Sequence, residues 1–159
     1  MKKILITGIA GLLGSRLADW IIKNTKHKVV GIDDLSGGFL ENINREVRFY
    51  KFNLIDLEAL KGVFEKEKID IVYHFAAYAA EGLSPFIRKF NYENNLIASI
   101  NLINNSIKYD VKRFVFASSM SVYGNAHEPP FSEEMQQIPI DPYGVAKFSV
   151  EQDLKIAYE

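Results

Sequence analysis

Short apolar runs alternate with longer amphipathic stretches along this chain, and the first two runs stop at a glycine and at an aspartate. Runs of this kind are typical of strands that are buried on both faces of a parallel sheet. The pattern predicts strands at Lys3–Thr7, Lys28–Asp33, Val47–Phe52, Ile69–Phe75 and Arg113–Ala117.

Between the predicted strands, apolar residues recur at three- and four-residue steps, as they do in helices that lie on a sheet. The first such stretch runs to Asn24, and the face expected to lie on the sheet carries Leu13, Leu17, Trp20 and Ile21. Asp141 is suited to the N-cap of the last helix because Pro142 follows it at the first helical position. The other predicted helices are Leu57–Lys66, Pro85–Tyr109 and the one that begins at Asp141.

This alternation requires right-handed crossovers, and it predicts an α/β fold with a mostly parallel, doubly wound sheet of the Rossmann type in three αβα layers. A chain of 159 residues is long enough for one domain with a sizeable core, so we expect residues 1–159 to fold as one unit. The segment from Gly124 to Pro142 holds four of the five prolines and is expected to be irregular.

Gly8, Gly11 and Gly14 follow the first predicted strand and open the first predicted helix. In dinucleotide-binding folds such glycines allow a tight turn, close approach of the backbone to the pyrophosphate, and packing of the helix on the sheet. The phosphates then bind N–H groups at the helix N-terminus. The spacing here is Gly-x-x-Gly-x-x-Gly rather than Gly-x-Gly-x-x-Gly, and the alternative interpretation is a structural turn that is rich in glycine.

Asp33 ends the second predicted strand, where its carboxylate can accept hydrogen bonds from both hydroxyls of an adenosine ribose. The same charge repels a 2′-phosphate, and with Asp34 beside it no arginine or lysine occurs before Arg45. The sequence therefore favours NAD over NADP. The alternative for Asp33 is an ordinary turn residue.

Tyr143 and Lys147 are four residues apart at the start of the last predicted helix, so their side chains leave the same helix face. A phenol is a poor base at neutral pH, but positive charge from Lys147 and an oxidised nicotinamide stabilises the phenolate. The phenolate can then accept a hydroxyl proton as hydride leaves the carbon. Ser119 can hydrogen-bond the same substrate oxygen. The alternative is a surface helix with an exposed lysine.

The composition narrows the class of partner and the compartment. A formal net charge of -1 gives no general attraction to nucleic acid or to an anionic membrane surface. The opening Met1-Lys2-Lys3 and its apolar stretch are interpreted as a strand, with a signal peptide as the alternative. The chain has no cysteine, which excludes disulfides, thiolate nucleophiles and zinc held by cysteine. We expect a cytoplasmic protein.

Two sets of titratable residues form no pattern that defines a site. The three histidines, His27, His74 and His127, are too scattered for a metal site, and no metal is expected. Glu81, Glu133 and Glu134 are interpreted as solvated loop charges. The alternative for these glutamates is that they act on the site through a neighbouring group.

An ordered set of motifs runs along nearly all of the chain. The motifs are Thr7-Gly8-x-x-Gly11-x-x-Gly14, Asp33-x-Leu35-Ser36-x-Gly38, His74-Phe75-Ala76-Ala77, Asn95, Ser118-Ser119-x-Ser121-Val122-Tyr123-Gly124 and Pro142-Tyr143-x-x-x-Lys147. In this order they resemble the extended short-chain dehydrogenase/reductase family, in particular its NAD-dependent epimerase/dehydratase group. The set is highly specific for the family and much less so for a substrate.

The resemblance implies epimerisation of a nucleotide sugar, with a UDP-sugar as the substrate. NAD oxidises the sugar at C4 with Tyr143 as base. The 4-keto sugar then rotates in the site, and hydride returns to its other face. By the same resemblance Lys147 also holds the nicotinamide ribose, and Ser119, Met120 and Ser121 contact the substrate. The implied cofactor-binding residues are Gly8, Gly11, Leu12, Leu13, Gly14, Asp33, Asp34, Leu35, Ser36, Gly38, Asn53, Leu54, Phe75, Ala76, Ala77, Asn95, Ala117, Tyr143 and Lys147.

The chain departs from the pattern of its relatives in the residues that would contact adenine, and one further comparison bears on the reaction. Asn53-Leu54 stands where the family has an adenine-contacting aspartate before isoleucine or leucine, and an amide oxygen can still accept from the adenine amino group. Dehydratases of the family usually carry Thr-Asp-Glu where this chain has Ser118-Ser119-Met120, which disfavours a 4,6-dehydratase. Decarboxylases and reductases of the family share the serine pattern and stay open.

The length of the chain is the second departure, because relatives of this kind are about twice as long, as two-domain enzymes commonly are. The resemblance therefore implies a truncated NAD-binding domain that lacks the C-terminal substrate domain. It also implies a homodimer that pairs through the two long helices. The rival class is a binding module that senses NAD without turnover, and the Tyr143–Lys147 pair favours catalysis.

Overall fold

The computed structural model describes residues 1–125 and 128–158, and these group into two compact units. One unit, here called the sheet unit, comprises Met1–Ala77 and Asn101–Ala117. The other, here called the helical unit, comprises Tyr78–Ile100 and the chain from Ser118 onward. The organisation of residues 1–159 as one domain stays a prediction.

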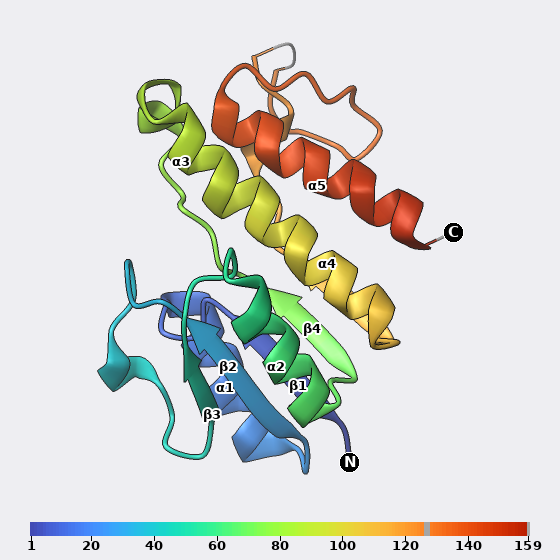
Figure 1. Ribbon diagram of the computed structural model, residues 1–159. Helices are drawn as coiled ribbons and strands as arrows, with labels where there is room; N and C mark the ends of the chain where they lie inside the picture. The colour runs from blue at the N-terminus through green and yellow to red at the C-terminus, as the bar shows by residue number, and fades with distance from the viewer. Residues whose placement is uncertain (126–127, 159) are drawn as a thin grey trace. The chain divides into compact units, whose positions relative to one another are not determined.

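The described residues of the sheet unit form one parallel sheet of five strands (Figure 1). The first two strands match their predicted ranges, and the others are shorter than predicted. Reversal of the strand order beside β1 is the topology of doubly wound folds, which confirms the predicted fold class. The strands pair in the order β3-β2-β1-β4-β5, with bounds β1 Lys3–Thr7, β2 Lys28–Asp33, β3 Arg48–Lys51, β4 Ile71–His74 and β5 Arg113–Phe116.

Two helices of the sheet unit, α1 (Leu12–Asn24) and α2 (Leu57–Glu67), lie on opposite faces of the sheet (Figure 1). The buried face of α1 carries small residues, so the predicted face was wrong in part: Leu13 is 62% exposed and Trp20 is 60% exposed. Small side chains are favoured on the buried face because they let the helix backbone approach the sheet closely. The residues buried on α1 are Gly14, Ser15, Ala18 and Ile21.

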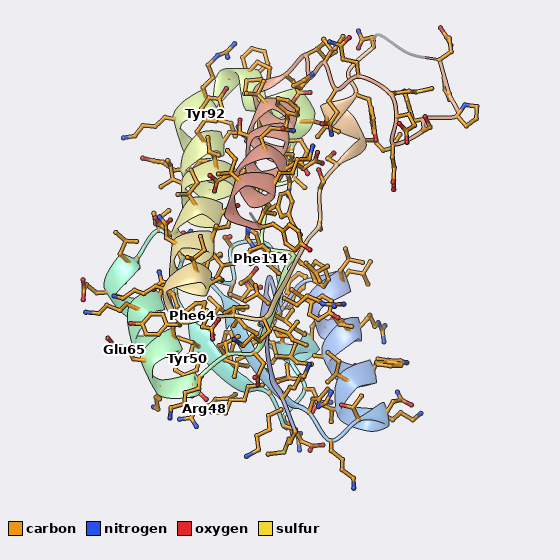
Figure 2. All side chains as sticks on the ribbon, turned by 90° about the vertical axis from the view of Figure 1, so that its right-hand side faces the viewer. Arg48, Tyr50, Phe64, Glu65, Tyr92 and Phe114 are labelled. Atoms are coloured by element: carbon orange, nitrogen blue, oxygen red, sulfur yellow. The ribbon has the colours of Figure 1, made fainter. Side chains whose placement is uncertain are left out.

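The carboxylate of Glu67 ties the last turn of α2 to two strands. Glu67 is only 1% exposed, and its oxygens lie 3.0 Å from Lys3 Nζ and 2.6 Å from Arg48 Nε. Tyr50 donates its hydroxyl to the same carboxylate, and Arg48 and Tyr50 lie near one another on β3 (Figure 2). Burial acts to raise the pKa of Glu67, but these hydrogen bonds and cations outweigh it and hold the pKa below its ordinary value.

Glu67→Gln is expected to destabilise the chain by about 1–2 kcal/mol at pH 7, because a buried charge-assisted network loses its charge. A carboxylate whose pKa is depressed by folding stabilises the fold above its unfolded pKa of about 4.3 and loses that contribution as the pH falls through the folded pKa. Urea unfolding measured from pH 7 downward should therefore show that the difference in the free energy of unfolding between parent and variant becomes smaller in acid. The exposed Glu46→Gln variant is the control, and a gap that stays constant with pH contradicts the prediction.

The predicted helix Pro85–Tyr109 is not one continuous α-helix. It is divided into η2 (Glu81–Phe86, a 3-10 helix), α3 (Arg88–Tyr92), the π-helical turn η3 (Glu93–Ile97) and α4 (Ala98–Lys108). At the end of the π turn, the N–H of Ala98 bonds the carbonyl of Glu93. The apolar spacing of this stretch is compatible with a plain helix, so periodicity could not reveal the inserted residue.

The helical unit ends with η4 (Met120–Val122, a 3-10 helix) and α5 (Pro142–Tyr158). The predicted N-cap of α5 is confirmed, because Asp141 Oδ1 accepts the N–H of Gly144 at 2.9 Å. In the residues that the structure describes, no helix is long and apolar enough to cross a membrane.

Candidate functional site

The glycine turn between β1 and α1 is built from backbone alone. Gly8 has φ +70°, a conformation that L side chains rarely adopt, and its carbonyl accepts the N–H of Gly11 at 3.1 Å. Gly11 is the N-cap of α1 and supplies no side-chain acceptor. The first N–H groups of a helix have no partner within the helix, so this N-terminus is suited to bind an anion.

Close contacts explain why glycine is required in the turn. A Cβ on Gly8 would lie 2.7 Å from the backbone nitrogen of Ala76, and one on Gly14 would lie 2.3 Å from the carbonyl oxygen of Gly8. A Cβ on Gly38 would lie 2.6 Å from the carbonyl carbon of Ala10. The turn, the end of β4 and the loop after β2 are therefore packed backbone to backbone.

Asp33 holds the glycine turn and the loop after β2 together. Its Oδ2 accepts the N–H of Ala10 at 2.9 Å, and its Oδ1 accepts the N–H of Leu35, a residue at φ +64°, at 2.8 Å. The carbonyl of Ala10 accepts from Asn42 Nδ2 at 2.8 Å. Each carboxylate oxygen can accept a further hydrogen bond, so the position of Asp33 is compatible with a ribose.

Asp34 and Asn53 bond to each other beside Asp33. Asn53 Nδ2 donates to Asp34 Oδ2 at 2.7 Å, and Asn53 Oδ1 accepts the N–H of Ile55 at 3.0 Å. Burial acts to raise the pKa of Asp34, but hydrogen bonds from Ser36 and Asn53 outweigh it and lower the pKa. The amide oxygen predicted to contact adenine thus already accepts a backbone N–H.

The end of β4 closes the other side of the turn. His74 Nδ1 lies 2.6 Å from the hydroxyl of Thr7, which also accepts the N–H of Ala76 at 3.2 Å. The N–H of Ala117, after β5, bonds the carbonyl of His74 at 3.2 Å. His74 is fully buried, in keeping with its interpretation as a packing residue.

The residues of the sheet unit fit a dinucleotide. The turn lies after β1, where the strand order reverses, and ligands of doubly wound folds bind at this point beside the carboxyl ends of the strands. A pocket of about 480 Å³ opens there, between the glycine turn, the exposed side of α1 and residues 37–42. A helix N-terminus for phosphate and a carboxylate for ribose are both present at this edge.

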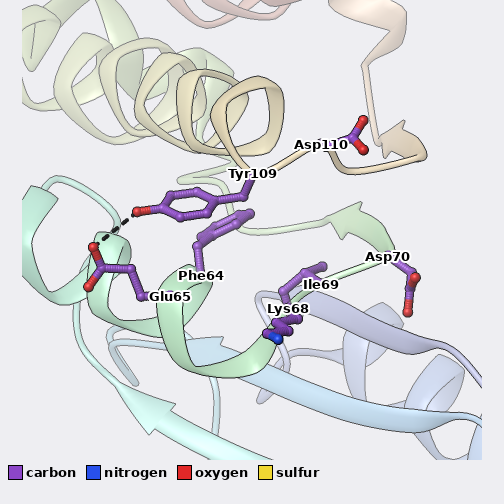
Figure 3. Close-up of a pocket in the computed structure, with 7 residues that line it drawn as sticks. All are labelled: Phe64, Glu65, Lys68, Ile69, Asp70, Tyr109 and Asp110. Atoms are coloured by element: carbon purple, nitrogen blue, oxygen red, sulfur yellow. Dashed lines mark hydrogen bonds between the residues drawn. The ribbon is translucent and has the colours of Figure 1, made fainter.

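A second pocket, of about 430 Å³, lies elsewhere in the sheet unit (Figure 3). The ring of Tyr109 contacts Phe64 there at a tilt of 30°, and the Tyr109 hydroxyl donates to Glu65 Oε1 at 3.2 Å. Asp70 precedes β4 and Asp110 precedes β5, so this pocket lies at the amino ends of the strands. It is at the opposite edge of the sheet from the glycine turn.

In the helical unit, Tyr143 and Ser119 meet. Tyr143 is 7% exposed and shares a hydrogen bond with Ser119. Burial raises the pKa of Tyr143, the Ser119 hydrogen bond opposes that rise, and the charges of Glu81 and Asp141 add to it. Without a bound cation, the phenol therefore keeps its proton at neutral pH.

Lys147 lies one turn along α5 from Tyr143, with its Nζ 5.7 Å from the centre of the phenol ring. It is 3% exposed, and burial lowers the pKa of its ammonium to about 8. This amine is therefore mostly charged at pH 7, and the alternative interpretation as an exposed surface lysine does not hold.

Three contacts fix α5 against the rest of the helical unit. The N–H of Tyr143 donates to the buried Ser84 Oγ at 3.2 Å. A Cβ on Gly144 would lie 2.6 Å from the carbonyl of Ser121, so α5 and η4 touch through backbone. Asn91 Nδ2 donates to the carbonyl of Pro142 at 2.9 Å.

Asn95 lies in the π turn and is bonded on both sides. Its Oδ1 accepts the N–H of Tyr78 at 2.7 Å, and its Nδ2 donates to Asn91 Oδ1 at 2.8 Å. Through Asn91 it is connected to the start of α5. Within the helical unit, Asn95 is thus a buried brace for the helix that carries Tyr143.

The candidate residues fall in two sets. The glycine turn, Asp33, Asp34, Asn53, Phe75 and Ala117 belong to the sheet unit, whereas Asn95, Ser119, Tyr143 and Lys147 belong to the helical unit. The prediction that one NAD molecule spans both sets stays a prediction. Met120, implied to contact substrate, is exposed.

Sequence reasoning missed Ser84 and Asn91. It left Glu81 open between a solvated loop charge and an acid that acts through a neighbouring group, and Glu81 is exposed. Ser121 Oγ donates to Glu81 Oε2, which connects this carboxylate to the serines. No local pattern marks these contacts, because the partners are far apart in the sequence. Among the described residues no group of three histidines, cysteines or acids could hold a metal ion, and His127 lies outside them.

A glycine turn, an acid at the end of β2 and a parallel sheet in this order define a dinucleotide-binding protein of the Rossmann type. Residues 4–158 match the NAD dependent epimerase/dehydratase family, and the chain belongs to that family. The resemblance of its ordered motifs is thereby confirmed.

Individual relatives are similar over almost the whole chain. UDP-glucose 4-epimerase of Bacillus subtilis is 36% identical over 159 residues, which cover 96% of this chain and 47% of that protein. dTDP-D-glucose 4,6-dehydratase of Dictyostelium discoideum is 34% identical over an alignment that covers 100% of this chain and 41% of that protein. The structure of UDP-glucose 4-epimerase with UDP-glucose from Thermotoga maritima superposes with a TM-score of 0.93 at 38% identity, covering 98% of this chain and 50% of that one. The chain spans about half the length of these relatives.

Proposed function

We propose that the protein to which this chain belongs is an NAD-dependent nucleotide-sugar 4-epimerase that acts on a UDP-sugar. The observation that carries the proposal is the buried Tyr143 phenol, hydrogen-bonded to Ser119 and one helical turn from the buried Lys147. The membership in the epimerase/dehydratase family and the epimerases among its relatives support it.

The proposed roles follow from the chemistry of each group. NAD, when bound, supplies the hydride acceptor for oxidation at C4 and the hydride donor for reduction. The N-terminus of α1 holds the pyrophosphate and Asp33 holds the adenosine ribose. Tyr143 takes the C4 hydroxyl proton while hydride leaves that carbon, and it returns the proton when hydride is added to the other face. The sugar therefore undergoes no net oxidation.

Tyr143 must first lose its own proton. Burial, Glu81 and Asp141 raise its pKa, so positive charge brought next to the ring has to offset them. Lys147 supplies one such charge and a bound oxidised nicotinamide supplies a second. In this proposal, base strength at Tyr143 develops when the cofactor binds.

The test is a product analysis with the complete protein. Incubation with UDP-galactose and NAD should yield UDP-glucose, detected by chromatography, with no NADH accumulating. The UDP-N-acetylhexosamines that differ at C4 are the second pair of substrates to test. Tight binding of NAD with no change in any UDP-sugar would favour the NAD-sensing module instead.

A sugar dehydratase is the second candidate, favoured by Glu81. Elimination of a hydroxyl needs an acid to protonate the leaving oxygen. No acid stands at Met120, but the structure brings the carboxyl group of Glu81 to Ser121, and a dehydratase would need this group protonated. Mass analysis separates the two reactions, because epimerisation conserves the mass of the nucleotide sugar and dehydration removes one water.

Asp33→Asn is expected to weaken NAD binding about tenfold and to reduce the preference for NAD over NADP. The amide keeps one acceptor oxygen for the loop but loses the charge that strengthens a ribose contact and repels a 2′-phosphate. Calorimetric titration of both dinucleotides into the chain measures the two affinities, with Glu46→Gln as the control for loss of charge. An unchanged ratio of the NAD and NADP affinities would contradict the assignment of Asp33 to the ribose.

We further propose a cytoplasmic homodimer that pairs through the helices that follow Pro85 and Asp141. Exposed apolar side chains on these helices, among them Ile97, Ile107 and Ile156, support the pairing. The absence of cysteine is in keeping with a reducing compartment. Sedimentation equilibrium of the complete protein tests the oligomeric state.

A further inference from the structure

A row of hydrogen-bonded side chains joins Tyr143 to Glu81 within the helical unit. Tyr143 bonds Ser119, and Ser119 Oγ lies 3.2 Å from Ser121 Oγ. Ser121 Oγ in turn bonds Glu81 Oε2. The N–H of Ser121 also donates to Ser119 Oγ at 3.2 Å, which fixes the spacing of the two serines.

The direction of this row is set by its last member. An ionised carboxylate can only accept, so Ser121 must donate its hydroxyl proton to Glu81. Ser121 Oγ is then an acceptor for Ser119, whose single proton is used in that bond. Ser119 lowers the pKa of Tyr143 when it donates to the phenol oxygen. While the row is intact, the Ser119 proton is directed at Ser121 Oγ instead, so Ser119 presents a lone pair toward Tyr143 and the phenol is the donor.

Glu81 also reaches Tyr143 through backbone. Ser84 Oγ donates to the carbonyl of Glu81 at 2.7 Å and accepts the N–H of Tyr143 at 3.2 Å. The first turn of η2 is thus bonded to the start of α5 independently of the serine row. This second connection holds the Glu81 backbone in place when its side chain is changed.

We propose that Glu81 is a positioning residue, which acts through Ser121 to hold the Ser119 hydroxyl as an acceptor toward Tyr143. This inference rests on the proposed function of Tyr143 as the base. A phenolate at Tyr143 needs a donor, and Ser119 becomes one only when its proton is released from Ser121. Glu81 therefore keeps the proton on Tyr143 until the row is broken.

The groups that face Tyr143 from neighbouring elements are Glu81 on η2, Ser119 before η4, and Asp141 and Lys147 at the start of α5. Glu81 acts on the phenol in two ways, by its charge and by the row of hydroxyls. A useful experiment must separate these two effects, and the chain offers a variant for each.

The experiment is a titration of Tyr143 in the chain itself, labelled with ¹³C on the tyrosine rings and assigned with Tyr143→Phe. Glu81→Gln removes the charge and supplies an amide that can donate to Ser121, so Tyr143 should titrate at lower pH than in the parent. Ser121→Ala keeps the charge and cuts the row, and it too should lower the titration pH. Glu134→Gln, an exposed loop glutamate of the same unit, should match the parent.

Two outcomes would overturn the proposal. If Ser121→Ala titrates like the parent, Glu81 acts by charge alone. If Glu81→Gln titrates like Glu134→Gln, Glu81 does not act on Tyr143 at all. The double variant Glu81→Gln/Ser121→Ala should shift by less than the sum of the single shifts, because both changes break one row.

The titration separates this inference from the proposed function. It requires neither NAD nor a sugar, so it reports on the row even if the complete protein catalyses another reaction. Where the complete protein is an epimerase, Glu81→Gln should also move the acidic limb of the pH profile of kcat/KM to lower pH, since the base loses its proton more readily. A role of Glu81 in folding alone would not move that limb.

Discussion

Replacing Tyr143 with phenylalanine is expected to lower the turnover of sugar epimerisation by the complete protein by about 10³-fold or more, while leaving NAD affinity close to that of the parent. The variant keeps the buried ring and removes only the oxygen that accepts the C4 proton. Ser119 retains its bonds to Ser121, so no buried polar group loses all its partners. The loss should therefore appear in kcat rather than in stability.

The measurement combines steady-state kinetics with a thermal unfolding curve and a calorimetric titration of NAD. Tyr92→Phe is the matched control, because it makes the same change on α3 of the same unit (Figure 2). Turnover by Tyr143→Phe that equals the control would refute the assignment of the base and with it the mechanism.

Gly14→Ala is expected to destabilise the chain by about 3 kcal/mol and to weaken NAD more than about tenfold. The added Cβ would lie 2.3 Å from the carbonyl of Gly8 and 2.8 Å from the Cα of Ile9, both backbone atoms that cannot rotate away. The N-terminus of α1 has to move off the turn, and its N–H groups then no longer point at one phosphate position.

Gly62→Ala supplies the control with the opposite sign. Gly62 lies in α2 of the same unit, and an added Cβ there meets nothing within 4 Å. Alanine in an open helix interior stabilises by about 0.5–1 kcal/mol relative to glycine. Urea unfolding and NAD titration are measured for both variants. Equal effects of the two substitutions would show that the close contact at Gly14 is not the cause of the lost stability and affinity.

Local sequence rules located the elements that carry the site. β1 and β2 were predicted to the residue because each apolar run meets a residue that ends it, Gly8 in one case and Asp33 at the end of the other. The start of α5 followed from Asp141 and Pro142, since capping is decided within one turn.

Burial on helices was predicted less well. Leu13 and Trp20 were assigned to the buried face of α1 by hydrophobicity, yet Gly14 and Ala18 occupy it. The spacing of apolar residues shows how hydrophobic a helix face is. It does not show how closely the helix backbone has to approach the sheet. The requirement for glycine at position 14 comes from the close approach of the glycine turn, which spacing alone does not describe.

The surroundings of Tyr143 could not be predicted for a different reason. Its pKa depends on Glu81, and its backbone is held by Ser84, residues that lie 62 and 59 positions earlier in the sequence. Sequence patterns within one helix place Lys147 correctly but say nothing of partners from another segment. The direction of the pKa shift therefore emerged only from the folded chain.

The π turn has a consequence for how this sequence can change over time. An α-helix advances about 100° per residue, so loss of one residue between Glu93 and Ile97 would rotate everything after it by that angle relative to Asn95. The residues that follow would then no longer keep their present direction relative to the bond between Asn95 and Tyr78. A deletion in this segment is therefore expected to be tolerated less well than an exchange of one side chain for another.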